Sequence, residues 1–317
     1  MKRVLIAAVL FLSFGCRQES LGPLNGILVV HSKTLTDFID HGGLESLHMV
    51  IETVDPEQVF SFSYAELSEF TGTLQERRII LMLVDSAHSG IVPGSLEELE
   101  EGILFGEDVW ALNQQVFAVC LEPGDSLPEV LPDMLVEAYN SQMASYVYRS
   151  FVSTSMTSEE RVDSLRQIGF TMDVPKSYLT HSWRPEDGFV QFQRQPDDES
   201  LLLFSLSVIR SRAELNSENA MLAREAMART FFFDAAADSV DRARTNAVPF
   251  SAGSIQGLEL TGVWRNPEYL NAGSFTTRVL DAGDEWYIMD MEVYNPGHAK
   301  EPYLREGWII MDTFRKE

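Results

Sequence analysis

The fold is decided by residues 257–294, which read GLELTGVWRNPEYLNAGSFTTRVLDAGDEWYIMDMEVY. Apolar and polar residues alternate with a period of two in three segments of this stretch, 258–265, 274–280 and 286–294. That period is typical of strands with one face in the core. Pro267 ends the first segment because proline has no N–H to donate, and residues 281–284 predict a short turn between the other two. We therefore predict three consecutive antiparallel strands, buried on one side and mixed on the other.

Charged residues mark the mixed side of these strands. We expect this open face to carry Glu259, Arg265, Arg278, Asp290 and Glu292. Opposite charges on neighbouring strands form cross-strand ion pairs, which is a purely structural role. The same face is also suited to a polar ligand or partner, with Arg265 and Arg278 as the contacting residues. The sequence leaves both interpretations open.

Other elements place this stretch in a domain of its own. Residues 188–193 and 201–209 predict a hairpin, and Ser217 is expected to cap a helix that runs to about residue 238. A final helix carries Leu304 and Trp308 on its apolar side. The C-terminal region is therefore predicted to be an α+β domain, an antiparallel sheet packed with helices.

The N-terminal region has a different pattern. Residues 27–30 and 79–84 are wholly apolar, which is typical of strands buried on both faces. Helices are expected between such strands, at 33–52, from Ser95 onwards, and at 126–151. This alternation predicts a mixed α/β domain. We place the N-terminal domain at 25–156 and the C-terminal domain at 157–317.

Composition excludes one class of partner. The chain has 317 residues, of which 45% are hydrophobic, and a net charge of −24. The hydrophobic content is that of a globular protein. The negative charge repels phosphate backbones, so we expect no binding to nucleic acid.

The N-terminus predicts export and a lipid anchor. Lys2 and Arg3 precede a short apolar stretch at 4–12, and Gly15-Cys16 then resembles the end of a lipobox. We predict that residues 1–16 are a lipoprotein signal peptide, that Cys16 is lipidated, and that 17–24 is a tether. The alternative is an ordinary secretory signal that is cleaved nearby. Cys120 lies in an apolar run and is expected to be a small buried core residue.

Two polar clusters contain residue types used in catalysis or metal binding. They are His41, Glu45 and His48, and Asp85, Ser86, His88 and Ser89. A Gly-Gly pair interrupts the first cluster, where a zinc site would need a rigid helix. The second follows a predicted strand as a polar turn would, whereas catalytic triads combine distant parts of a fold. We therefore predict no catalytic residue, no metal site and no cofactor.

Trp183 is a candidate contact residue. It lies in Ser182-Trp183-Arg184-Pro185, which predicts a turn, so we expect an exposed side chain. Tryptophans are more often core residues, but an exposed one is suited to partner binding.

Several short stretches together resemble a known family. They are Asn25-Gly26-Ile27-Leu28-Val29-Val30, Arg78-Ile79-Ile80-Leu81, Asp108-Val109-Trp110-Ala111 with Gln114 or Gln115, Ile168-Gly169-Phe170 followed by Pro175 and Tyr178, and Gly262-Val263-Trp264 with Gly273-Ser274-Phe275. In this order, and with the final helix, the chain resembles a lipoprotein family of Gram-negative bacteria described only as a domain of unknown function, number forty-eight thirty-seven. The resemblance implies an envelope lipoprotein with two α/β-type parts and supplies no catalytic residues. The C-terminal region also resembles the PsbP/Mog1-like sandwich, by analogy of fold alone.

These observations predict a cell-envelope lipoprotein that faces the periplasm, is held to a membrane by its lipid, and binds an envelope protein or component without catalysis. The alternative is an envelope hydrolase with a site between the two domains, since clefts between domains are common ligand sites.

Overall fold

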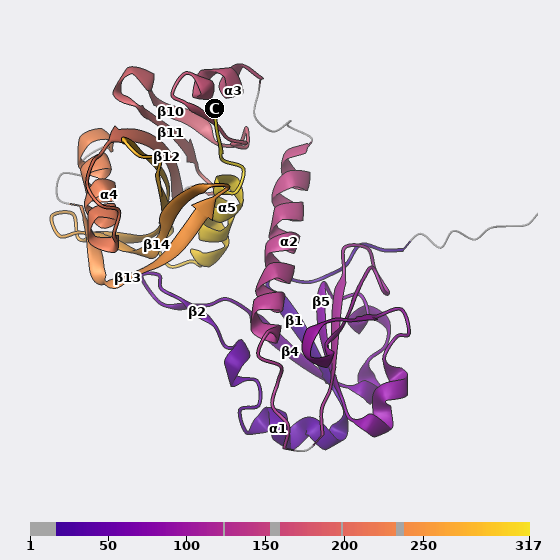
Figure 1. Cartoon of the computed structure of the whole chain (residues 1–317). Helices are drawn as coiled ribbons and strands as arrows, with labels where there is room; N and C mark the ends of the chain where they lie inside the picture. The colour runs from indigo at the N-terminus through magenta and orange to yellow at the C-terminus, as the bar shows by residue number, and fades with distance from the viewer. Residues whose placement is uncertain (1–16, 123, 153–158, 198, 233–237) are drawn as a thin grey trace, which may run out of the picture. The chain divides into compact units, whose positions relative to one another are not determined.

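The computed structural model describes residues 17–122, 124–152, 159–197, 199–232 and 238–317 (Figure 1). They form two compact units. The first contains the chain up to Glu45 and Ser61–Asp133, and the second contains Ser46–Phe60 and Met134–Glu317. These units do not coincide with the predicted domains 25–156 and 157–317, because 46–60 and most of a long helix pack with the C-terminal sheet. The predicted signal peptide and Cys16 lie outside the described residues.

The first unit is built on a six-stranded mixed sheet. Its strands, in spatial order, are β4 (Ser61–Glu66), β1 (Gly26–His31), β5 (Ile79–Val84), β8 (Gln115–Cys120), β7 (Leu104–Glu107) and β6 (Glu97–Glu98). The first four pair in parallel, and the last two are antiparallel. Every residue of β5 is buried, as its continuous apolar sequence predicts for a central parallel strand. The mixed α/β prediction is confirmed.

Helices in the first unit are shorter than predicted. In place of a helix at 33–52 there is one short helix, α1 (Thr36–Asp40), with single 3-10 turns around it. The helix expected from Ser95 is wrong, since Glu97 and Glu98 pair with β7 as strand β6. Cys120 is exposed rather than buried, because it is the last residue of β8, at the end of the sheet.

The second unit is built on a seven-stranded antiparallel sheet. Its strands, in spatial order, are β10 (Leu179–Arg184), β11 (Phe189–Arg194), β12 (Leu201–Arg210), β16 (Glu285–Tyr294), β15 (Asn271–Asp281), β14 (Ile255–Asn266) and β13 (Ser239–Ala252). The predicted three-strand run is therefore β14–β15–β16, and the predicted hairpin is β11–β12. Two small sheets accompany it, β2 (Val50–Ile51) with β3 (Glu57–Gln58), and β9 (Phe170–Thr171) with β17 (Arg315–Lys316).

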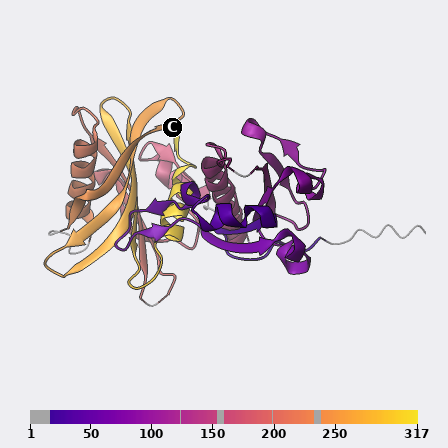
Figure 2. The same ribbon diagram turned by 90° about the horizontal axis from the view of Figure 1, so that it is seen from below.

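Helices α4 (Ser217–Phe231) and α5 (Glu301–Met311) cover the two faces of this sheet. The second unit also contains α3 (Glu159–Arg166) and most of α2 (Leu131–Val152). Figure 2 shows α4 on one side of the sheet and α5 on the other. At Gly307 of α5 an added β-carbon would lie 2.7 Å from the Met291 Cβ, so glycine lets this helix approach the sheet closely. The predicted sheet packed with helices is confirmed.

The two faces differ from the prediction in one respect. The expected open side is closed, because eight successive residues of β16 and of β15 are buried on both faces. Arg278 and Glu259 lie on the face covered by α5, here called the α5 face. Asp290 and Glu292 lie on the opposite face, the α4 face, where Arg224 of α4 contacts both. The prediction that all four share one side is therefore wrong, because alternate residues of β15 and β16 face opposite helices.

Two strands of the sheet were missed. Strand β13 reads SVDRARTNAVPFSA, which has no clear apolar period, and it contains Pro249 and a shift of register after Val240. Such features are typical of an edge strand. The predicted turn around Trp183 is instead strand β10, the opposite edge of the sheet. Helix α4 also ends earlier than predicted, and Asn216 rather than Ser217 caps it by accepting a hydrogen bond from the Asn219 N–H.

Candidate functional site

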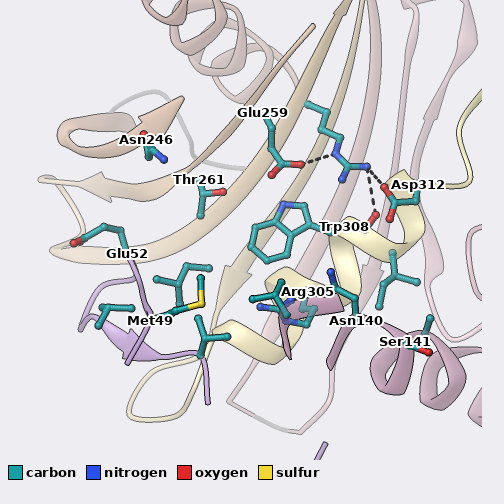
Figure 3. Close-up of a pocket in the computed structure, with 17 residues that line it drawn as sticks. Met49, Glu52, Asn140, Ser141, Asn246, Glu259, Thr261, Arg305, Trp308 and Asp312 are labelled. Atoms are coloured by element: carbon teal, nitrogen blue, oxygen red, sulfur yellow. Dashed lines mark hydrogen bonds and ion pairs between the residues drawn. The ribbon is translucent and has the colours of Figure 1, made fainter. Parts of the chain in front are cut away.

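A pocket of about 830 Å³ opens on the α5 face of the second unit (Figure 3). Strands β13, β14 and β15 form its floor, and α5, α2 and the β2 segment form its walls. In Figure 3 the labelled Met49 and Glu52 lie at one end, Asn140 and Ser141 lie at the other, and Trp308 stands in the middle. All the lining residues belong to the second unit, so the pocket is internal to it.

The β2–β3 hairpin is held in place through α5. The Glu57 carboxylate accepts hydrogen bonds from the backbone N–H groups of Lys300 and Glu301, each at 2.9 Å. These groups form the N-terminus of α5, where free N–H groups and the helix dipole favour an anion. Arg244 of β13 donates to the carbonyl oxygens of Thr53 and Val54 on the same segment. One carboxylate and one guanidinium thus position the wall that carries Met49 and Ile51.

Helix α2 is attached to α5 by a buried polar network. The Tyr139 hydroxyl donates to Glu301 Oε2 at 2.8 Å, and Arg305 Nε donates to Glu301 Oε1 at 2.6 Å. Arg305 also donates to Asn140 Oδ1, and its guanidinium lies 4.2 Å from the centre of the Tyr139 ring. Burial raises the pKa values of both Tyr139 and Glu301. The network fixes the position of Asn140 at the pocket.

Arg278 lies at the floor of the pocket with its charge neutralised. Its Nε donates to Glu259 Oε2 at 2.7 Å and its Nη1 donates to Asp312 Oδ1 at 2.6 Å. Glu259 is its direct cross-strand neighbour, so the predicted cross-strand ion pair is present. The guanidinium also stacks over Phe250, 4.0 Å from the ring centre. Only 5% of the Arg278 surface is exposed. This arginine therefore holds the residues of the floor in place and is not available to a ligand as a free cation.

The remaining lining is mostly apolar. Trp308 lies beside the Arg305 guanidinium, which is 5.4 Å from its ring. Its Nε1 atom is buried and has no hydrogen-bond partner among the residues that the structure describes. The aliphatic side chains of the walls are Met49, Ile51, Val59, Val136, Ala144 and Ile309. Such a surface favours an apolar ligand with a hydrogen-bond acceptor near Trp308.

The charged lining residues are all paired. Arg278 is paired with Glu259 and Asp312, and Arg305 is paired with Glu301. At the rim, Glu52 lies 3.5 Å from Arg244. The side chains of Asn246 and Thr261 add uncharged hydrogen-bonding groups. Each charged lining residue therefore has an ionic partner in the protein, which disfavours ionic ligands.

The structure brings only one of the predicted contact residues to this pocket. Arg278 lines it, whereas the Arg265 side chain is 63% exposed and pairs with Asp241 at 3.8 Å. Trp183 is 36% exposed and lies on β10. Four strands separate β10 from β14, the strand of Arg265. The three candidates therefore do not form one surface.

Members of the two predicted polar clusters make local hydrogen bonds. Asp85 caps a 3-10 turn and accepts hydrogen bonds from the His88 N–H at 2.9 Å and from His88 Nδ1 at 2.6 Å. Hydrogen bonds from Thr34 and His88 lower the pKa of Asp85 to about 2. His41 bonds to the Asp37 carbonyl of its own short helix. Within the described parts of the chain, no group of three or more His, Cys, Asp or Glu side chains is placed to hold a metal.

Cys120 is also a poor nucleophile despite its exposure. Partial burial of the sulfur and nearby acidic groups, Glu122 first among them, raise the pKa of its thiol. The reactive thiolate is therefore disfavoured at neutral pH.

Comparison with known proteins matches the seven-stranded sheet of the second unit, with α3, α4 and α5, to a family. A family model described as "Domain of unknown function (DUF4837)" matches residues 155–313, which is half of the chain. The chain belongs to this family. The DUF4837 match covers the pocket floor and α5, but it does not include the β2 segment or α2.

Solved structures similar to this DUF4837 protein share little sequence with it. A protein from Bacteroides thetaiotaomicron is 10% identical, with a TM-score of 0.28, over 47% of this chain and 45% of its own. Cyanobacterial PsbP from Synechocystis is 9% identical, with a TM-score of 0.34, over 48% and 88%. LpqN, "involved in cell envelope biogenesis of Mycobacterium tuberculosis", is 10% identical, with a TM-score of 0.28, over 45% and 79%. The search of curated proteins found no match.

Sequence reasoning missed most of the pocket of this DUF4837 protein. Arg305 was not singled out, although its spacing of four from Glu301 is typical of an ion pair on a helix. Trp308 was interpreted only as part of an apolar helix face. The β2 segment gave no signal, because its role depends on a contact with α5, far away in sequence.

Proposed function

We propose that this protein is a periplasm-facing, lipid-anchored envelope protein that binds an uncharged, mainly apolar ligand in the α5-face pocket and catalyses no reaction on it. The observation that carries the proposal is the lining of the pocket, in which aliphatic walls surround Trp308 and every charged group is paired within the protein. A ligand with an acyl or aromatic body fits these properties.

The size and energetics of the pocket support such a ligand. A volume of about 830 Å³ is within the usual range for small-molecule sites. Burial of apolar surface contributes roughly 25 cal/mol for each Å² removed from water. An ionic ligand would have to compete with short internal bonds such as the one at 2.6 Å between Arg278 and Asp312. Binding of an apolar body leaves these bonds intact.

The envelope location rests on the sequence before the fold. Lys2, Arg3, the apolar stretch at 4–12 and Cys16 have the pattern of a lipoprotein signal. None of the helices in the described residues is long and apolar enough to cross a membrane. A lipid on Cys16 would anchor the protein and leave the binding unit in the periplasm.

The alternative is an envelope hydrolase. Among the described residues that line this pocket, the hydroxyl groups belong to Ser141 and Thr261, and none of the side chains is a histidine that would activate them. The arrangement supports binding better than acyl transfer.

The test uses the neutral apolar fluorophore N-phenylnaphthylamine with the purified full chain. Ala144→Trp should fill the pocket and weaken binding of the fluorophore about tenfold or more, because an indole would occupy the ligand volume. Ser145→Trp, on the same helix but outside the pocket lining, should bind it as the unmodified protein does. Equal binding by both variants would place the fluorophore elsewhere and refute the pocket assignment. Cleavage of p-nitrophenyl butyrate that Ala144→Trp abolishes would instead favour the hydrolase.

A further inference from the structure

A second pocket opens on the α4 face of the second unit and has a different set of polar side chains. Its volume is about 440 Å³, and it lies between the ends of β11, β12, β14 and β16 and the C-terminal end of α4. The acidic side chains among its described lining residues are Asp238 and Glu292, and neither arginine nor lysine is among them. Unlike the α5-face pocket, this one has acidic side chains with no guanidinium among the lining residues that the structure describes, and His181 is the other titratable side chain there besides the tyrosines.

The carboxylates around this pocket outnumber the cations beside them. Arg224 of α4 donates from Nε to Asp290 at 2.7 Å and from Nη2 to Glu292 at 2.9 Å. Asp238 receives a hydrogen bond at 2.7 Å from the neutral Asn266 amide. The Arg224 guanidinium is thus bonded to two carboxyl groups, those of Asp290 and Glu292, whereas Asp238 is bonded to a neutral amide. Arg224 is 2% exposed, so its charge is fixed in the interior and is not shared with a ligand.

Two residues that line this pocket have buried polar atoms that lack partners in the described structure. Trp264 lines it and is 4% exposed, and its Nε1 donor has no hydrogen-bond partner in the described structure. The Asn271 Oδ1 acceptor, on another lining residue, is likewise buried and unpaired there. Buried groups of this kind are normally satisfied, and a ligand is one means of satisfying them. The Trp264 Nε1 atom lies against Gly273, so a ligand pairs with it only after a small movement of the indole. A ligand that pairs with both atoms needs a donor and an acceptor.

Aromatic rings complete the wall. Phe232, Tyr269 and Tyr294 line the pocket together with Trp264. Ring faces attract organic cations, and the attraction is strongest where water is excluded. An aromatic wall beside uncompensated carboxylates is suited to an ammonium group.

We propose that the α4-face pocket binds a small primary amine that carries a neighbouring oxygen, as in an amino alcohol, with its ammonium group beside Asp238 and Glu292 and its oxygen near Trp264. This site is separate from the α5-face pocket and does not depend on the function proposed for that pocket.

Proton linkage supports the proposal. Burial raises the pKa of Glu292 to about 8, and the neighbouring Asp290 and Asp238 charges act in the same direction, whereas Arg224 lowers it. Burial also raises the pKa of Asp238. A bound ammonium group stabilises the carboxylate forms and therefore releases protons. At neutral pH we expect amine binding to be accompanied by proton release from Glu292.

The test is calorimetric titration of the purified full chain with ethanolamine at neutral pH, in two buffers that differ in ionisation enthalpy. We expect one saturable site, proton release, and no binding of ethylene glycol, its uncharged counterpart. Asp238→Asn and Glu292→Gln should each weaken binding about tenfold or more, since each removes a charge-assisted contact. Glu292→Gln should also abolish the proton release.

Controls separate this site from the general acidity of the protein. Asp284→Asn removes a carboxylate whose side chain is 90% exposed on the β15–β16 turn, and it should leave binding unchanged. Tyr269→Ala, at a position 54% exposed, should weaken binding without affecting the fold, which thermal unfolding checks. Failure of ethanolamine to saturate, equal binding by Asp238→Asn, or binding of glucose instead of ethanolamine would overturn the proposal. Ala144→Trp should bind ethanolamine normally, so failure at one pocket is distinguishable from failure at the other.

Discussion

A few ionic residues are buried in the core of the second unit. Arg224 lies within the core on the α4 face, 3.9 Å from the centre of the Phe275 ring, with Asp290 and Glu292 as its partners. Burying charge is costly unless it is paired and hydrogen bonded. The hydrogen bond from Arg224 to Glu292 (2.9 Å) is longer than the one to Asp290 (2.7 Å). Burial raises the pKa of Glu292 to about 8. The residue is thus a site where pH affects the stability of the fold.

The free energy of unfolding is expected to fall as pH rises from weakly acidic to weakly alkaline. We predict that Glu292→Gln makes this fall smaller. The folded protein holds a proton on Glu292 up to about pH 8, whereas the unfolded chain releases it near the ordinary glutamate pKa of about 4.3. The folded state therefore binds more protons across this window, and the free energy of unfolding falls as pH rises through it. Glutamine cannot titrate, so this contribution disappears. Urea unfolding at both ends of the window measures the effect.

Glu268→Gln, at an exposed position, is the control for that experiment and should retain the pH dependence of the unmodified protein. If the slope of stability against pH is the same in Glu292→Gln as in the unmodified chain, Glu292 does not carry the buried proton.

At the scale of elements, the β2–β3 hairpin is attached to a helix and a sheet that lie far from it in sequence. Its attachment depends on Glu57, which caps the N-terminus of α5 through the Lys300 and Glu301 N–H groups. Val54 adds a backbone hydrogen bond to Ser274 Oγ at 3.2 Å. The hairpin in turn carries Met49 and Ile51 to the pocket, so one capping contact connects helix stability to the shape of the site.

We predict that Glu57→Ala lowers the stability of the second unit by about 0.5–2 kcal/mol, the usual cost of losing a helix cap. The same change should weaken binding of N-phenylnaphthylamine, because the wall that carries Met49 loses its attachment. Thermal unfolding and the fluorophore titration measure the two effects. Gln58→Ala, at the exposed neighbouring position, should change neither, and a Glu57→Ala protein that behaves like it would show that the cap does not support the pocket.

At the scale of the whole molecule, the chain combines an acidic two-unit fold with a proposed anchor ahead of it. Residues 1–16 contain Lys2 and Arg3 but no acidic residue, while the chain as a whole has a net charge of −24. Such a charge repels anionic surfaces and gives the fold no electrostatic affinity for an anionic membrane surface. Membrane attachment would therefore rest on the lipid at Cys16 alone.

We predict that Cys16→Ala releases the protein from the membrane fraction into the soluble periplasmic fraction. The change removes the acylated sulfur, and acyl burial is the force that holds such proteins to bilayers. Cell fractionation followed by immunoblotting measures the distribution, and Cys120→Ala serves as the matched cysteine control. A Cys16→Ala protein that still sediments with membranes would refute lipid anchoring.

By itself, the sequence determined the strands that have a clear pattern of apolar and polar residues within a short stretch. The period of two at 257–294 predicted β14, β15 and β16, and the apolar run at 79–84 predicted the buried strand β5. Residues 188–193 and 201–209 predicted the β11–β12 hairpin. Each of these patterns reports how neighbouring residues partition between core and solvent.

Only the tertiary structure decided which helix covers which face and which distant segments meet there. The sequence predicts Arg278 and Glu292 on one open face, but α5 covers the first and α4 covers the second. Strand β13 was missed because an edge strand needs no apolar period, and the β2 segment because Glu57 meets Lys300 far along the chain. Both pockets arise from such long-range contacts. The alternation of residues along a strand specifies its two sides, but the elements that pack on those sides are selected by the rest of the chain.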